Sequence, residues 1–168
     1  MGRLFDAAAA LLGFTREITF EGQAAMWLEN LARRAPDVEP YPFPFEDREL
    51  DFRPLLESVA HDRVRGRDHA EIARAFHRGV ANCCFKLVNE LDPAHEIEAV
   101  VLSGGVFQNE LLLEDLKIVL AADDREIITN HAVPPNDGGI SLGQAAVAAF
   151  RMRKVDEASN ESRTVALK

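Results

Sequence analysis

The sequence predicts an α/β fold, and the strongest evidence is a strand, a glycine turn, a helix and a second strand in succession. Glu98–Leu102 is apolar and β-branched without a helical period, which predicts a buried strand. Gly104-Gly105 follows as a turn, and Glu126–Thr129 reads as the second strand. Between them, helical spacing relates Leu112, Leu116, Val119 and Leu120. Strand, helix and strand in this order predict a parallel pair joined by a right-handed crossover.

Composition and charge narrow the class of protein. The chain has 168 residues, of which 47% are hydrophobic and 28% charged, which is enough for one globular domain with a core. A net charge of −9 argues against nucleic acid or an anionic membrane surface as partners. No apolar run approaches the roughly 20 residues that span a bilayer. The adjacent Cys83-Cys84 has neither metal-ligand spacing nor a disulfide pattern, so we expect a reducing, cytoplasmic location.

The first part of the chain is predicted to be helical. Apolar residues recur on one face of Gly2–Leu12, a helix that Gly13 ends. A second helix is predicted over Ala24–Arg34. Four prolines make Ala35–Glu46 a non-helical connector, and Glu49–Phe52 is predicted to be a short strand.

Two further helices are predicted before the first glycine turn, at Arg53–Val64 and His69–Leu91. Asp68 is a candidate N-cap for the longer one, with Glu71 in capping-box position. Asp92-Pro93 is expected to end it. Its apolar stripe consists of Ile72, Phe76, Val80, Cys83, Leu87 and Leu91.

The remaining segments set the predicted domain limits. A helix runs from Val106 to about Ala122, and another, rich in alanine, covers Ile140–Arg153. The last segment, Val155–Lys168, has little hydrophobic period. We therefore expect one domain over residues 1–154 and a flexible tail over residues 155–168.

Two glycine pairs, Gly104-Gly105 and Gly138-Gly139, precede helices and are candidate ligand-binding loops. Loops at the carboxyl edge of a parallel sheet bind ligands, and amide groups at a helix start suit a phosphate or carboxylate. Taken alone, each pair is equally well explained as a tight turn. Two such pairs near asparagines favour a ligand site. Neither matches the G-x-G-x-x-G fingerprint or a Walker A loop.

Several polar residues could each have one of two roles. Asp137 either caps the following helix or supplies an oxygen ligand to a divalent cation. Asn109 either caps a helix or bonds to a ligand, and Asp6 is a surface carboxylate or an acceptor for ribose hydroxyls. The five histidines lack paired metal spacing, and His77 is expected to be packed or half-exposed on its helix. None is assigned a catalytic role.

Four motifs together resemble one family. LSGGVFQN (Leu102–Asn109) and PPNDGGISLGQA (Pro134–Ala145) resemble the carboxyl-terminal part of HypF, the hydrogenase maturation carbamoyltransferase. MGRLFDAAAALLG (Met1–Gly13) and ITFEGQAAM (Ile18–Met26) resemble the same family upstream. The motifs occur in the family's order, and the resemblance runs from Met1 to about Ala149.

The resemblance implies a fold and an activity. HypF proteins use carbamoyl phosphate and ATP, form a carbamoyl-adenylate, and pass the carbamoyl group to the C-terminal cysteine thiol of HypE. That group is the precursor of the cyanide ligands in nickel–iron hydrogenase. The domain concerned is similar to the universal tRNA threonylcarbamoyladenosine protein. It has a duplicated actin/Hsp70/sugar-kinase-like (ribonuclease H-like) fold with a mixed sheet flanked by helices.

This chain would be the second half of that duplication. The first half, which supplies a histidine metal motif in the family, would lie outside it, so the isolated chain is expected to be inactive. The face that the first half would cover is expected to be apolar, and a homodimer through that face is a further expectation.

The resemblance also implies roles for individual residues. The nucleotide is expected to contact Asp6, Gly22, Gly104, Gly105, Asn109 and Gly138. Asp137 is expected to be a ligand of a divalent metal whose identity the sequence leaves open. No residue of this chain is assigned as catalytic, because carbamoyl transfer depends mainly on positioning.

Two alternatives stay open. An O-carbamoyltransferase of the antibiotic or nodulation type shares the fold, although the sequence motifs VFQN and PPNDGGI favour HypF. A non-catalytic nucleotide-binding module is the alternative from a different class.

Overall fold

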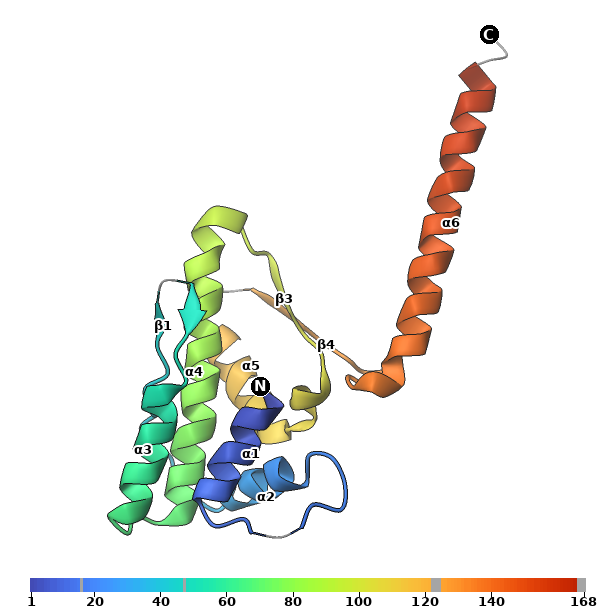
Figure 1. Cartoon of the computed structure of the whole chain (residues 1–168). Helices are drawn as coiled ribbons and strands as arrows, with labels where there is room; N and C mark the ends of the chain where they lie inside the picture. The colour runs from blue at the N-terminus through green and yellow to red at the C-terminus, as the bar shows by residue number, and fades with distance from the viewer. Residues whose placement is uncertain (16, 47, 122–124, 166–168) are drawn as a thin grey trace. The chain divides into compact units, whose positions relative to one another are not determined.

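The protein is a mainly helical α/β chain (Figure 1), seen in a computed structural model that describes residues 1–15, 17–46, 48–121 and 125–165. It divides into two units, Met1–Thr129 and Asn130–Lys168. The first unit contains α1 (Gly2–Leu11), α2 (Gln23–Ala32), β1 (Phe45–Glu46), β2 (Glu49–Leu50), α3 (Arg53–Val64), α4 (His69–His95), β3 (Ala99–Leu102), the 3₁₀ helix η1 (Gly105–Gln108), α5 (Glu110–Leu120) and β4 (Glu126–Thr129). The second contains the 3₁₀ helix η3 (Asp137–Gly139) and α6 (Ile140–Val165).

Helix α4 is the centre of the first unit, because α2, α3 and α5 all contact it. Four of the six residues predicted for its apolar stripe are buried, whereas Leu87 is half-buried and Leu91 is exposed. The largest fully buried side chains of the core are Phe5, Leu12, Leu28, Leu55, Val59, Ile72, Phe76, His77, Val80, Leu112, Leu116 and Leu120. The first unit is therefore held together mainly by apolar side chains that are buried around α4.

The predicted start of α4 is confirmed, but its predicted end is wrong. The Asp68 carboxylate accepts hydrogen bonds from the N–H groups of Ala70 and Glu71, as an N-cap does. The helix continues through Asp92-Pro93 to His95. It ends where Glu96 adopts a left-handed conformation with φ of 48°, and the Asp92 carboxylate accepts from the Ile97 N–H at 2.7 Å.

The helices at Gly2–Leu11 and Arg53–Val64 match the predicted ones closely, and α2 ends two residues before the predicted Arg34. The short strand after the proline-rich connector is also confirmed. It pairs antiparallel with β1, where Phe45 lies opposite Leu50. The pairing adds a hairpin that the sequence analysis did not foresee, because two-residue strands carry too little pattern.

The mixed sheet that the resemblance implies for the duplicated domain is seen only in part, since the described residues form two small two-stranded sheets, one antiparallel and one parallel. Strands β3 and β4 pair in parallel as predicted, with Ala99 opposite Glu126. The expectation of a buried strand is also corrected, since Val101 is 65% exposed and only Leu102 of β3 is buried. An apolar run marks a strand that can be covered on both faces, but only one face of this strand is covered here.

The helix expected from Val106 starts later. The turn after Gly104 is the 3₁₀ helix η1, and α5 begins at Glu110. Asn109 separates the two helices because its φ of −74° and ψ of 100° are extended, the conformation of an N-cap residue.

The last helix, which lies in the second unit, continues beyond its predicted end at Arg153. Helix α6 runs from Ile140 to Val165 and so covers most of the expected tail, while residues 166–168 lie outside the described part. Alanine, lysine, arginine and glutamate are good helix formers, and neither glycine nor proline interrupts 144–165. Within the described part of the chain, no helix is long and apolar enough to cross a membrane.

Candidate functional site

The first glycine turn has a backbone that only glycine adopts readily. Gly104 has φ of 114° and ψ of 161°, and it is the N-cap of η1. Its carbonyl accepts a hydrogen bond from the Phe107 N–H at 3.0 Å, and the Val106 carbonyl accepts from the Asn109 N–H at 3.1 Å. A Cβ atom at Gly104 would meet nothing within 4 Å, so the requirement for glycine is conformational and not steric.

Asn109, which follows the turn, is 8% exposed and uses both ends of its amide within the protein. Its Oδ1 accepts a hydrogen bond from the Leu112 N–H at 2.9 Å. The side-chain oxygen therefore caps α5, which is one of the two roles that the sequence allowed for Asn109. Its Nδ2 donates to His77 Nε2 at 3.0 Å. Asn109 therefore connects the glycine turn to α5 and to α4 at once.

His77 is fully buried on α4, which settles the open expectation of a packed or half-exposed residue. Its Nδ1 donates to the Ala73 carbonyl at 2.8 Å. The rings of Phe5 and Phe76 pack edge-on against the imidazole, with centroid distances of 5.3 and 5.9 Å. Burial lowers the pKa of His77 to about 4, so the ring is neutral at physiological pH.

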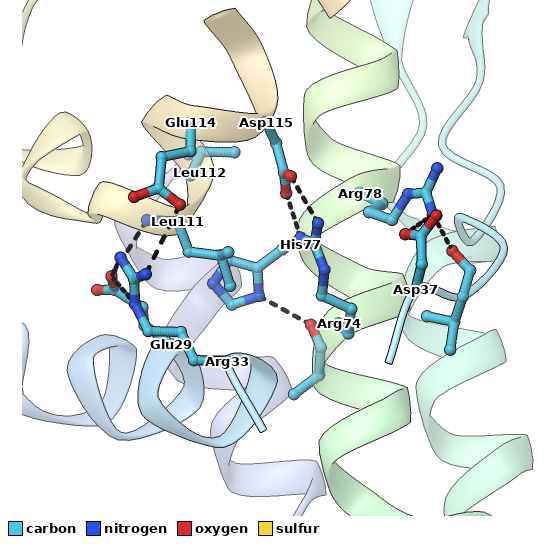
Figure 2. A network of polar contacts seen from close by, with 12 residues as sticks. Glu29, Arg33, Asp37, Arg74, His77, Arg78, Leu111, Leu112, Glu114 and Asp115 are labelled. Carbon is cyan, nitrogen blue, oxygen red and sulfur yellow. Dashed lines mark hydrogen bonds and ion pairs between the residues drawn. The ribbon is translucent and has the colours of Figure 1, made fainter. Parts of the chain in front are cut away.

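A set of charged residues ties α2 to the first turn of α5 (Figure 2). The Glu29 carboxylate accepts from the Leu111 N–H at 3.2 Å and from the Arg33 guanidinium at 2.9 Å. Arg33 also lies 3.6 Å from the carboxylates of Glu110 and Glu114. Glu29 and Asn109 already accept hydrogen bonds from the N–H groups of Leu111 and Leu112. These two N–H groups at the start of α5 are therefore not free to bind a ligand. Anion binding at this joint would instead use amides of the glycine turn that precedes it.

A buried ion pair joins α4 to α5 on the other side of His77 (Figure 2). Arg74 contacts Asp115 through its two terminal guanidinium nitrogens, one of them at 2.7 Å, and the side chains are 16% and 8% exposed. The hydrogen bonds to Asp115 raise the pKa of Arg74 above its usual value. Further along α4, Arg78 bonds to Asp37 and to the Val38 carbonyl, which fastens the proline-rich connector.

The sequence predicted a packed or half-exposed His77, but it did not predict the bond between His77 and Asn109 or the ion pair of Arg74 with Asp115. His77, Arg74 and Asp115 flank predicted apolar stripes, and buried polar residues at such positions need partners. That signal could have marked them as buried. It could not have paired them, since His77 and Asn109 are 32 positions apart and Arg74 and Asp115 are 41 apart.

The structure brings part of the predicted nucleotide site together. Gly104, Gly105 and Asn109 form one continuous turn. Asp6 is half-buried on α1, directly after Phe5, whose ring contacts His77. Gly22 is the N-cap of α2 and has φ of 80°. The roles of these residues toward a nucleotide stay predictions.

The second glycine loop belongs to the second unit and is built differently. Asn136 Oδ1 accepts from the Gly138 N–H at 3.1 Å, so Asn136 caps η3 and Asp137 is its exposed first residue. A Cβ at Gly139 would lie 2.7 Å from the Pro134 carbonyl oxygen, so close packing requires glycine there. Gly138 and Asp137 therefore stand at a short, tightly packed helix start.

The described residues do not form a metal site around Asp137. Over residues 1–15, 17–46, 48–121 and 125–165, no group of three or more His, Cys, Asp or Glu side chains could hold a metal ion. Asp137 contributes one carboxylate, which is too little to bind a divalent cation by itself. The described residues thus do not complete a metal site, and the assignment of Asp137 stays a prediction.

Comparison with known proteins decides the family. A family model described as the carbamoyltransferase, Kae1-like domain, second subdomain, matches residues 1–144. The chain belongs to the HypF carbamoyltransferase family. The resemblance drawn from the four motifs is thereby confirmed, and so is the expectation that this is the second half of a Kae1-like domain.

Related HypF proteins share much of the sequence but are far longer. The carbamoyltransferase HypF of Rhodobacter capsulatus is 40% identical over 153 residues, which are 90% of this chain and 20% of that protein. HypF of Synechocystis sp. is 37% identical over 149 residues, 86% of this chain and 18% of that protein. The chain thus spans about a fifth of the length of these HypF proteins.

Two solved structures are similar in fold. A full-length HypF in the phosphate- and nucleotide-bound form has a TM-score of 0.82 and 44% identity, covering 88% of this chain and 24% of that one. HypF of T. kodakarensis has a TM-score of 0.82 and 28% identity, covering 92% of this chain and 20% of that one. The fold of this HypF subdomain is therefore shown by sequence and structure together.

Proposed function

We propose that this chain is a working part of a HypF carbamoyltransferase. The whole enzyme would move a carbamoyl group from carbamoyl-adenylate, made from carbamoyl phosphate and ATP, to the C-terminal cysteine thiol of a HypE-type protein. The product would supply the cyanide ligands of a nickel–iron hydrogenase. The observation that carries this proposal is the family match over residues 1–144. The 44% identity to a HypF solved with phosphate and nucleotide supports it.

The transfer step sets what this subdomain must do. The thiolate of the acceptor attacks the carbamoyl carbon, a carbon–sulfur bond forms, the carbon–oxygen bond to the phosphate breaks, and AMP leaves. Such a step gains most from holding the thiolate within reach of the face of the carbamoyl carbonyl and from donors aimed at the charge that develops on its oxygen. No side chain of this chain needs to react covalently.

The glycine turn is the part of the chain best suited to the nucleotide. The backbone at Gly104 carries no side chain in its extended left-handed conformation, so a phosphate can approach the peptide groups there. Gly105 and Asn109 complete the turn, and Asp6 and Gly22 would contact the ribose side. Gly138 would contribute from the second loop, and Asp137 would be one ligand of a divalent metal.

A complementation assay tests the proposal. Rhodobacter capsulatus HypF would be produced without the segment that matches this chain, and this chain would be added back as a separate protein. We expect carbamoyl-phosphate-dependent formation of AMP and S-carbamoylation of a cysteine-ended HypE peptide only when both parts are present. Peptide mass would report the product, and this chain alone should give neither.

A matched pair of variants controls for folding. Gly104→Ala and Gly66→Ala each place a side chain on a glycine of positive φ, at 114° and 79°, with open space around both. Only Gly104 lies in the proposed site, so it alone should abolish complementation when both variants fold. Transfer to a hydroxyl acceptor in place of the thiol would indicate an O-carbamoyltransferase. ATP binding without transfer would indicate a nucleotide-binding module.

A further inference from the structure

We propose that His77 is a positioning residue for the glycine turn: it fixes the orientation of the Asn109 amide and thereby holds the backbone of Gly104–Gln108 in its binding geometry. The inference rests on the proposed function for the identity of the ligand. The hydrogen bonds that carry it belong to the protein alone.

The hydrogen bonds around His77 allow only one arrangement of protons. The Ala73 carbonyl can only accept, so the proton of the neutral ring is on Nδ1, which lies 2.8 Å away. Nε2 is then an acceptor, and it faces the Asn109 Nδ2 at 3.0 Å. This leaves Asn109 Oδ1 toward the Leu112 N–H at 2.9 Å, where an acceptor is required. Every donor in the series meets an acceptor.

The reverse orientation of the amide is unfavourable at both ends. An Asn109 side chain turned by half a rotation would place its NH₂ group against the Leu112 N–H, and α5 would lose its cap. Asn109 has an extended backbone between η1 and α5, so the cap is also what joins the turn to the helix. His77 prevents this rotation because its Nε2 offers a lone pair and no proton.

The imidazole is itself held in place. It is fully buried, and the rings of Phe5 and Phe76 lie edge-on to it at 5.3 and 5.9 Å. The charged residues Arg33, Arg74 and Asp115 lie around it (Figure 2). Burial is the main reason that a second proton on the ring is disfavoured; Arg74 and Arg33 add to this effect, whereas Asp115 and the hydrogen bond to Ala73 oppose it. A neutral, immobile acceptor is therefore built into α4 opposite the turn.

The proposal is tested first without any variant, in the 168-residue chain. Nitrogen-15 NMR of His77 should show the tautomer protonated at Nδ1, and a scalar coupling across the hydrogen bond should link Asn109 Nδ2 to His77 Nε2. A ring protonated at Nε2 at neutral pH would overturn the proposal.

Two variants then separate positioning from simple packing. His77→Gln places an oxygen acceptor at the position of Nε2, whereas His77→Leu keeps bulk without an acceptor. We expect amide exchange at Leu112 to be about tenfold faster in His77→Leu, and near the wild-type rate in His77→Gln. Val59→Ala is the control because it removes fully buried methyl groups on α3. Faster exchange at Leu112 in Val59→Ala to the same degree would contradict the proposal.

A last arm links the bond to the ligand. Titration with MgATP should give about tenfold weaker binding to His77→Leu than to wild type and His77→Gln. Equal affinities of the wild type and both variants, with changed exchange at Leu112, would overturn positioning for the ligand. Absence of MgATP binding by the wild-type chain counts against nucleotide binding by this subdomain alone, while the NMR and exchange results still decide the structural link.

Discussion

The two glycine turns resemble each other in sequence, yet different contacts make them rigid. In the first, Asn109 is buried and its amide is bonded to α4 through His77. In the second, Asn136 bonds within its own loop, to the Gly138 N–H, and Gly139 packs against the Pro134 carbonyl. One turn depends on the tertiary core and the other on its neighbours in the chain.

The difference bears on function, because the two turns should respond to different perturbations. A change in the α4–α5 interface should reach the first turn through Asn109. The same change should leave the second loop intact, since its contacts are local.

The largest effect is expected from the buried ion pair that joins α4 and α5. Asp115→Ala leaves Arg74 buried without its partner, which should cost about 3 kcal/mol of the free energy of unfolding. Urea denaturation of the first unit measures it. Glu114→Ala is the matched control on the same helix, because its 3.6 Å contact with Arg33 is 59% exposed on the glutamate side. It should cost about 0.5 kcal/mol, and equal losses would argue against a buried pair.

The next effect is a pH dependence specific to the first turn. The pKa of His77 is about 4 in the folded state, against an ordinary value of 6.5. Below pH 6.5 the unfolded chain binds the proton more readily, so stability present above that pH is lost as the pH falls to about 4. The loss should approach about 3 kcal/mol, at 1.36 kcal/mol per pKa unit.

Urea midpoints at pH 7 and pH 4.5 measure the dependence. In His77→Gln the change between these two pH values should be much smaller. A variant with the wild-type pH dependence would assign the effect to carboxylates. Asp62 and Asp92, whose pKa values are lowered by their hydrogen bonds to Tyr41 and Arg125 respectively, titrate mainly below this window.

The next effect is expected from substitution of Gly104 or Gly139, which lie in different units of the chain. Gly104→Ala forces a residue with a Cβ to φ of 114° and should cost about 2 kcal/mol in the first unit. Gly139→Ala instead places a Cβ 2.7 Å from the Pro134 oxygen, so residues 133–139 must shift. The midpoint of thermal unfolding of the first unit should fall in Gly104→Ala. In the second, limited proteolysis of the loop should increase while the unfolding midpoint of the first unit stays the same.

Hydrophobic period located the helices, but it misplaced the end of α4, the start of α5 and the end of α6, and it did not predict the polar contacts. The limits of α3 and the N-cap at Asp68 follow from local signals, and β3 and β4 from two apolar runs. The start of α5 could also have been found, since Asn109 followed by Glu110 is a helix-start pattern. The bonds of His77 to Asn109 and of Arg74 to Asp115 depend on how α4 lies against α5. No local pattern in the sequence contains that information.

The smallest effect is expected in the second loop. Asn136→Ala removes one exposed bond to the Gly138 N–H at 3.1 Å and should cost about 0.5 kcal/mol, at the low end for a lost cap. Asn109→Ala removes a buried cap and also leaves His77 Nε2 without a donor, so its cost should be at least twice as large. Amide exchange at Gly138 and Leu112 measures each effect at its own turn. If Asn136→Ala changed exchange at Leu112, the two turns would be coupled, and local contacts would no longer explain the second loop.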